Sequence, residues 1–126
     1  MPADLPPAGP NACSRFRAGP TPDTADAMVA SARKKGQTVH GHTLIWHDSA
    51  SAWMYETGEK AAMTQYIMTM VKHFGNRTNI WDVVNEAISN GPGNPLRDNN
   101  PFAVAGPDFI ALAFRTVHAA NPAARL

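Results

Sequence analysis

Two polar residues that directly follow a short apolar run are the residues of this chain best suited to acid–base chemistry. Residues 81–84 (WDVV) precede Asn85 and Glu86, and the glycine- and proline-containing stretch 89–93 comes soon after. Tryptophan and valine favour a buried strand, so the pair is predicted to stand where a strand ends. In parallel α/β architectures the carboxyl ends of the strands carry the chemistry. A carboxylic acid there, beside an amide that can hold a hydroxyl, suits proton transfer to a sugar oxygen.

A second segment, residues 38–47 (TVHGHTLIWH), also has the composition of a strand. Side chains two positions apart share a face of a strand, so His42, Leu44 and Trp46 are predicted to point the same way. The same alternation places His47 on the opposite face from His42.

Between these two strands, apolar residues recur at helical spacing, and Gly75 can end the helix. The apolar residues are Met63, Tyr66, Ile67, Met70, Val71 and Phe74. A strand–helix–strand unit makes its two strands parallel and adjacent. His42 and Trp46 are therefore predicted to meet Asn85 and Glu86 at one rim of the sheet.

Two further helices are predicted outside this unit. Residues 23–36 carry acids early, bases late and a closing glycine, as expected of a helix. Pro107 can open a last helix that Pro122 ends. The intervening residues 91–107 form a long loop at the catalytic rim.

Residues 41–47 (GHTLIWH) and 81–87 (WDVVNEA) together resemble glycoside hydrolase family 10, the endo-1,4-β-xylanases. Residues 96–98 (LRD) and 109–115 (FIALAFR) resemble the next loop and helix of that family. The resemblance runs from about Asp26 to Leu126. It implies an α/β fold, a partial (β/α)8 TIM barrel with parallel strands and flanking helices. Residues 23–126 would be a fragment of the catalytic barrel that holds about the third and fourth βα units.

The resemblance also implies roles for four residues. Glu86 matches the acid/base, Asn85 matches the residue that hydrogen-bonds the sugar 2-hydroxyl, and His42 and Trp46 match residues that line the cleavage subsite. It implies xylan or xylooligosaccharide as substrate, internal cleavage with retention of configuration, no cofactor and action outside the cell. The family's glutamine and proline after the strand are Ser49 and Ser51 here, which removes the glutamine's contact with sugar.

The second carboxylate of such a site is not found in the sequence. A retaining mechanism needs two carboxylates about 5–5.5 Å apart, and the family's nucleophile is a glutamate on a later strand. The chain stops at Leu126, where a fifth strand is expected to begin, and a TIM barrel takes about 250 residues. The chain is therefore interpreted as a xylanase fragment that carries the acid/base, lacks the nucleophile and is inactive alone.

Two alternatives stay open. The chain could be a non-catalytic carbohydrate-binding or assembly fragment, in which exposed Trp46 and Trp53 stack on sugar and raw sheet edges favour self-association. It could instead be a partial reading frame with no function in isolation. Trp46 and Trp81 are each more typical of a core than of a sugar platform, and Trp46 is the better platform candidate.

His40, His42 and His47 raise the possibility of a metal site, which is not favoured. Alternation separates His47 from the other two histidines, and no carboxylate or cysteine completes a ligand set. His42 is as readily a structural histidine bonded to Asp82, a role that does not exclude contact with substrate.

Composition excludes several other classes of protein. A net charge of +1 provides no basic field for nucleic acid, and no apolar run is long enough to cross a bilayer. The single Cys13 excludes an internal disulfide. Residues 1–22 are rich in proline and have no apolar segment of the secretory type, so they are predicted to be a disordered leader rather than a signal peptide.

Overall fold

The computed structural model describes residues 22–93 and 95–126 of the chain. The elements follow in the order α1 (Pro22–Lys34), β1 (His40–Ile45), α2 (Ala52–Thr57), α3 (Lys60–Phe74), η2 (Gly75–Arg77), β2 (Ile80–Val84), η3 (Ala103–Ala105) and α4 (Phe109–Ala120). The predicted leader over residues 1–22 lies outside the described part of the chain, apart from its last residue.

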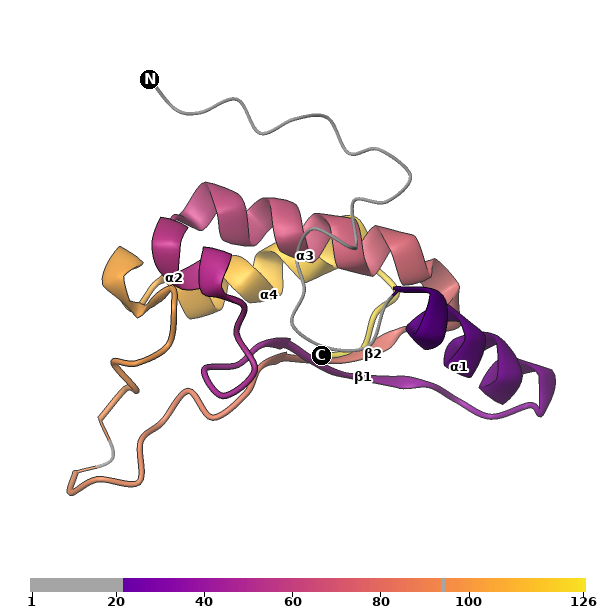
Figure 1. Cartoon of the computed structure of the whole chain (residues 1–126), viewed down its shortest axis with the longest axis horizontal. Helices are drawn as coiled ribbons and strands as arrows, with labels where there is room; N and C mark the ends of the chain where they lie inside the picture. Colours follow the sequence, from indigo (N-terminus) through magenta and orange to yellow (C-terminus); the bar gives the residue numbers. More distant parts are fainter. Residues whose placement is uncertain (1–21, 94) are drawn as a thin grey trace.

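β1 and β2 pair in parallel, with α3 as the crossover between them (Figure 1). His40 is opposite Ile80, and His42 is opposite Asp82. The predicted strand–helix–strand unit is therefore confirmed. The carboxyl ends of both strands meet at one edge, where their following loops begin.

The start of β2 also has a neighbour on its other side. Ile80 forms a parallel bridge with Arg125, whose N–H donates to the Asn79 carbonyl at 2.8 Å. The Trp81 N–H donates to the Arg125 carbonyl at 3.0 Å. The last described residues thus run beside β2 in the same direction, as expected of a further parallel strand.

The core lies between the strands and the helices α3 and α4, which lie on the same side of the strands (Figure 1). Its most buried members, each at most 1% exposed, are Ile45, Met63, Ile67, Val71, Val83, Phe102, Ala113 and Val117. The Trp81 ring lies against β1 at Gly41, where a Cβ would collide with it. Glycine at this position is therefore a packing requirement.

Two sequence predictions need correction. Alternation along β1 does not hold past His42, because the register shifts between His42 and Ile45, and Leu44 and Ile45 are buried in succession. Leu44 consequently joins the core, while His42 is exposed. Such an irregularity breaks the two-residue period on which the prediction depended. The last helix begins at Phe109 rather than at Pro107, with Asp108 at its N-cap.

Two helix ends were predicted correctly. Gly36 follows α1 with φ of 72°, and Gly75 follows α3 with φ of 50°. Glycine reaches this left-handed region without the clash of a Cβ, which is why it suits a helix end.

Candidate active site

Glu86 stands two residues after the end of β2, in an unusual backbone conformation. Its φ is 52°, and within residues 22–93 and 95–126 it is the one non-glycine residue with a positive φ. The left-handed region costs an L-residue roughly 1–2 kcal/mol. Backbone strain of this kind clusters at functional sites, so the observation marks Glu86 as a candidate independently of its side chain.

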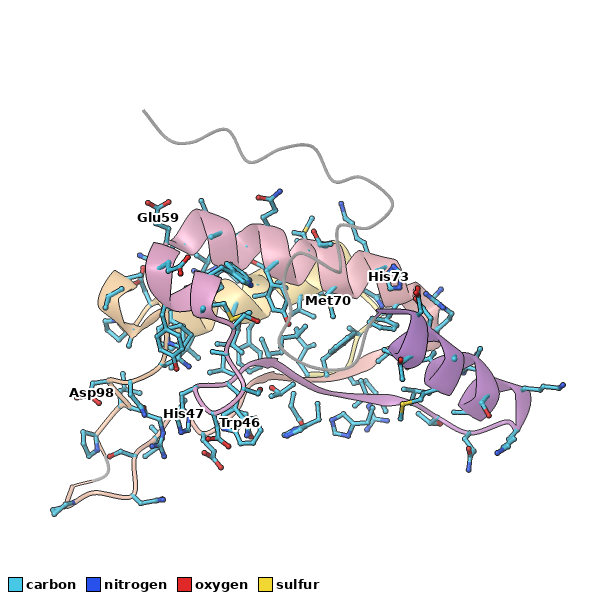
Figure 2. The ribbon with its side chains drawn as sticks, viewed as in Figure 1. Trp46, His47, Glu59, Met70, His73 and Asp98 are labelled. Atoms are coloured by element: carbon cyan, nitrogen blue, oxygen red, sulfur yellow. The ribbon has the colours of Figure 1, made fainter. Side chains whose placement is uncertain are left out.

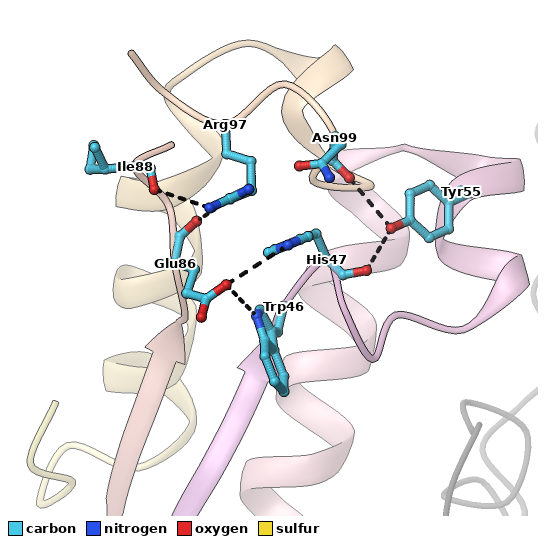
Figure 3. Close-up of polar contacts among 7 residues, drawn as sticks. All are labelled: Trp46, His47, Tyr55, Glu86, Ile88, Arg97 and Asn99. Carbon is cyan, nitrogen blue, oxygen red and sulfur yellow. Dashed lines mark hydrogen bonds and ion pairs between the residues drawn. The ribbon is translucent and has the colours of Figure 1, made fainter. Parts of the chain in front are cut away.

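The Glu86 carboxyl group is held from the neighbouring strand. Its Oε2 accepts a hydrogen bond from Trp46 Nε1 at 3.1 Å and lies 3.8 Å from His47 Nε2 (Figure 3). The side chain is 50% exposed, so the group is fixed through one oxygen and open to solvent. A carboxyl group in this arrangement can exchange a proton with a bound molecule at the other oxygen.

His42 connects this carboxyl group to a second acidic residue. Its ring lies 5.7 Å from the Trp46 ring, and its Nδ1 is 2.8 Å from Asp82 Oδ2. His40 Nε2 lies 3.1 Å from the other oxygen of Asp82. The predicted bond between His42 and Asp82 is thus confirmed, but His42 is exposed rather than part of the core. With Nδ1 on Asp82, the His42 nitrogen left for a ligand is Nε2.

The hydrogen bond from His42 lowers the pKa of Asp82 below its usual value against an opposing effect of burial, and the bond from His40 also lowers it. Asp82 is therefore a carboxylate that orients two imidazoles. Across the described part of the chain, no group of three histidine, cysteine, aspartate or glutamate side chains is arranged to hold a metal ion.

Asn85 is fixed to the same edge through its backbone. Its N–H donates to the Ile45 carbonyl at 2.9 Å, which joins the last residue of β1 to the start of the loop that follows β2. The side chain is half-buried. The structure thus brings Trp46 and Glu86 into contact, places His42 beside Trp46, and anchors Asn85 next to them.

The two other tryptophans belong to the core. Trp81 is 6% exposed, and its Nε1 donates to the Thr78 carbonyl at 2.9 Å. Trp53 is partly buried and packs on the Tyr66 ring at 5.8 Å. Both Trp46 and Trp53 are half-buried rather than exposed as predicted. Trp53 packs against the core, whereas Trp46 lies away from α3, at the end of the strands (Figure 2).

Sequence reasoning missed three residues of this site. His47 was placed on the opposite face, but β1 ends at Ile45, so alternation no longer governs its direction and its ring turns to Glu86. Arg97 Nε donates to the Glu86 carbonyl at 2.9 Å. The Tyr55 hydroxyl lies 2.8 Å from the His47 carbonyl and 3.4 Å from that of Asn99 (Figure 3). Arg97 belongs to the LRD motif, but the sequence alone predicted no role for its side chain.

A comparison with protein families identifies the class of protein to which this chain belongs. The family described as "Glycosyl hydrolase family 10" matches residues 13–126, and the chain belongs to that family. The match begins earlier than the Asp26 at which the sequence resemblance was recognised.

Curated relatives are xylanases. "Endo-1,4-beta-xylanase A" of Thermotoga neapolitana is 39% identical over 113 residues, which cover 82% of this chain and 11% of that protein. "Beta-1,4-xylanase" of Dictyoglomus thermophilum is 38% identical over 106 residues, which cover 81% of this chain and 30% of that protein. The chain therefore spans only a minor part of these relatives.

Solved structures of the family have the same local fold. A psychrophilic family 10 endo-β-1,4-xylanase superimposes with a TM-score of 0.74 at 34% identity, over 92% of this chain and 40% of the other. Native xylanase 10B from Thermotoga maritima gives 0.74 at 33% identity, over 90% and 36%. These likenesses confirm the predicted fold class: the parallel strands and flanking helices are part of a TIM barrel.

No helix within residues 22–93 and 95–126 is both long and apolar enough to cross a bilayer.

Proposed function

We propose that Glu86 is the general acid/base of a retaining endo-1,4-β-xylanase. The observation that carries this proposal is the contact between Glu86 Oε2 and Trp46 Nε1 at 3.1 Å, made where two adjacent parallel strands end. The carboxyl ends of barrel strands are where catalytic groups stand in TIM-barrel enzymes. Membership of glycosyl hydrolase family 10 supports the assignment of xylan as the substrate class.

In the first step, a second carboxylate attacks the anomeric carbon while protonated Glu86 donates its proton to the departing glycosidic oxygen, so that the sugar becomes bonded to that carboxylate. In the second step, the Glu86 carboxylate takes a proton from water as the water attacks the anomeric carbon and breaks the bond to the second carboxylate. Asn85 holds the sugar 2-hydroxyl, while His42 and Trp46 contact the sugar at the cleavage point. Trp46 has a further part, because its indole N–H holds one carboxyl oxygen and leaves the other to carry the proton.

The nucleophile of this reaction is proposed to come from outside the sequence described. A retaining site needs a second carboxylate about 5–5.5 Å from the first, and the chain covers 40% of a solved family member. The 126-residue chain alone is therefore expected to bind xylooligosaccharide weakly and not to hydrolyse it. Action outside the cell stays a prediction from the family.

A chimeric enzyme gives the sharpest test of these roles. Residues 38–98 would replace the corresponding segment of Thermotoga maritima xylanase 10B, whose fold matches this chain. The chimera is expected to hydrolyse xylan, and Glu86→Gln should lower kcat/KM by about 10²–10⁴-fold, as expected for loss of general acid/base catalysis. An active chimera that Glu86→Gln leaves unchanged would refute the assignment. Asp98→Asn, in the exposed loop, is the matched control.

The isolated chain separates the alternatives. Binding of xylobiose without turnover, lost on Trp46→Ala, is expected if the chain holds one half of the site. Turnover by the 126-residue chain would show that it supplies both carboxylates. Self-association through the outer edge of β1 is a further proposal. Within residues 22–93 and 95–126 this edge pairs with no other strand, and an unpaired edge can add a strand from another chain. Light scattering across a dilution series tests it.

A further inference from the structure

Arg97 binds the backbone on which Glu86 stands. Its Nε donates to the Glu86 carbonyl at 2.9 Å, and its terminal nitrogen donates to the Ile88 carbonyl at 3.4 Å (Figure 3). Its own backbone N–H donates to the Ala87 carbonyl at 2.7 Å. An antiparallel bridge between Ile88 and Leu96 continues this pairing. The loop after β2 thus folds back, and a side chain from its far arm holds the residue that carries the carboxyl group.

These contacts fix the direction of the Glu86 backbone. A guanidinium group is a planar fork whose N–H directions are set by its geometry, so two carbonyls held by one fork keep a fixed relation to each other. Glu86 has φ of 52°, a conformation that persists only when its surroundings enforce it. The Glu86 side chain leaves the same Cα, and its Oε2 reaches Trp46 Nε1 at 3.1 Å.

We propose that Arg97 is a positioning residue for the proton-donating carboxyl group. By holding the Glu86 carbonyl, it keeps Glu86 Oε2 on the Trp46 indole. Both oxygens that its side chain binds belong to the backbone, so Arg97 acts through Glu86 rather than on a substrate. The chemical purpose of this contact rests on the proposed function, but the contact itself is measurable without substrate.

The test uses the indole N–H signals of the three tryptophans in the ¹⁵N-labelled chain. Trp46→Phe identifies the Trp46 signal, and Glu86→Ala gives its position when the carboxyl group is absent. Arg97→Gln is expected to move the signal in the same direction as Glu86→Ala does. The double variant should show no further movement beyond Glu86→Ala, because both changes remove one contact. The Trp81 indole, bonded to the Thr78 carbonyl at 2.9 Å, should stay in place.

Matched variants make each outcome decisive. Arg33→Gln removes an exposed arginine at the end of α1 and should leave the Trp46 signal unchanged. Arg97→Lys keeps the charge and one donor, so partial recovery of the wild-type signal is expected. The proposal is overturned if Arg97→Gln behaves as Arg33→Gln does, or if the shifts in the double variant simply add. If Arg97→Gln also moves the Trp81 signal, Arg97→Lys replaces it in the comparison. The proposal is then overturned if Arg97→Lys behaves as Arg33→Gln does, or if its shift and that of Glu86→Ala simply add in the double variant.

Failure of this proposal is distinct from failure of the proposed function. The chimera assay with Glu86→Gln reports on proton transfer, whereas the indole signals report on the contact in the absence of sugar. An active, Glu86-dependent chimera combined with an unmoved Trp46 signal in Arg97→Gln would remove only the role of Arg97.

Discussion

The two faces of the β1–β2 pair are built from different chemistry. On the helix side, Trp81 and Val83 of β2 are 6% and 1% exposed and pack with Ile67 of α3. On the other side, the carboxylate of the half-buried Asp82 of β2 contacts the rings of His40 and His42 of β1. The first face is carbon against carbon, and the second consists of titratable groups that hold one another through hydrogen bonds.

The difference shows that the two faces of one short strand have different roles. Residues of the helix face determine whether the strands exist, because removing apolar area from water is the main favourable term in folding. Residues of the polar face contribute little to folding since they stay wet, and they are correspondingly available for chemistry. Substitutions on the helix face should therefore change stability, and substitutions on the polar face should change the chemistry of the site.

The largest effect on stability is expected from Ile67→Ala. Ile67 is 0% exposed, and truncation of a buried isoleucine leaves a cavity that costs about 2–5 kcal/mol. Denaturant unfolding measures the change. Val104→Ala, at a side chain that is 82% exposed, should stay within about 0.5 kcal/mol of wild type. Equal effects of the two variants would show that α3 does not cover the core.

A smaller effect is expected from Gly41→Ala, where the two strands meet. The new Cβ would collide with the Trp81 ring, and overpacking of this kind costs about 1–3 kcal/mol. Gly91→Ala is the matched control, because a Cβ there meets only the Ser89 hydroxyl at 3.5 Å. A thermal unfolding series compares them. If both variants melt together, the close approach of Trp81 to β1 is not part of the solution structure.

The smallest effect, and the one with a distinctive pH dependence, is expected from Asp82→Asn. The bond from His42 lowers the pKa of Asp82 in the folded chain, so the unfolded chain binds more protons in acid. The resulting stabilisation is fully present above the unfolded pKa of about 3.9 and is lost as the pH falls through the folded value.

Removal of Asp82 should accordingly make the acid-induced loss of stability shallower below about pH 4. At neutral pH the cost should not exceed about 1 kcal/mol, since the Asp82 side chain is 43% exposed. Urea unfolding across a pH series measures both effects, with Asp98→Asn as control. An unchanged acid limb in Asp82→Asn would show that its bonds to His40 and His42 do not form in solution.

The sequence was sufficient for the elements that repeat a simple period. Helical spacing from Met63 to Phe74 predicted α3, and the two apolar runs beside it predicted parallel neighbouring strands. Strand ends then placed Glu86 and Trp46 at one rim, where their side chains meet. These predictions succeeded because each depends on local pattern and on a general rule of connection.

What the sequence did not provide depends on irregular backbone and on long-range contacts. Because the register shifts after His42, the Leu44 side chain lies in the core. Because β1 ends before His47, the His47 side chain can lie near Glu86. Arg97 acts eleven residues from Glu86 through a loop with no periodic pattern, and Tyr55 reaches the His47 carbonyl across a turn. No propensity encodes these contacts, because they exist only once both strands are in place.

The left-handed backbone at Glu86 has a consequence for how this chain would change under selection for yield or heat resistance alone. Glycine adopts such a φ freely and asparagine tolerates it better than most residues, so both would be enriched at this position in a library sorted only for soluble protein. Each removes the carboxyl group proposed as the proton donor. Improvement of the fold and loss of the acid would therefore arrive together, in the trade-off between stability and activity that strained sites impose.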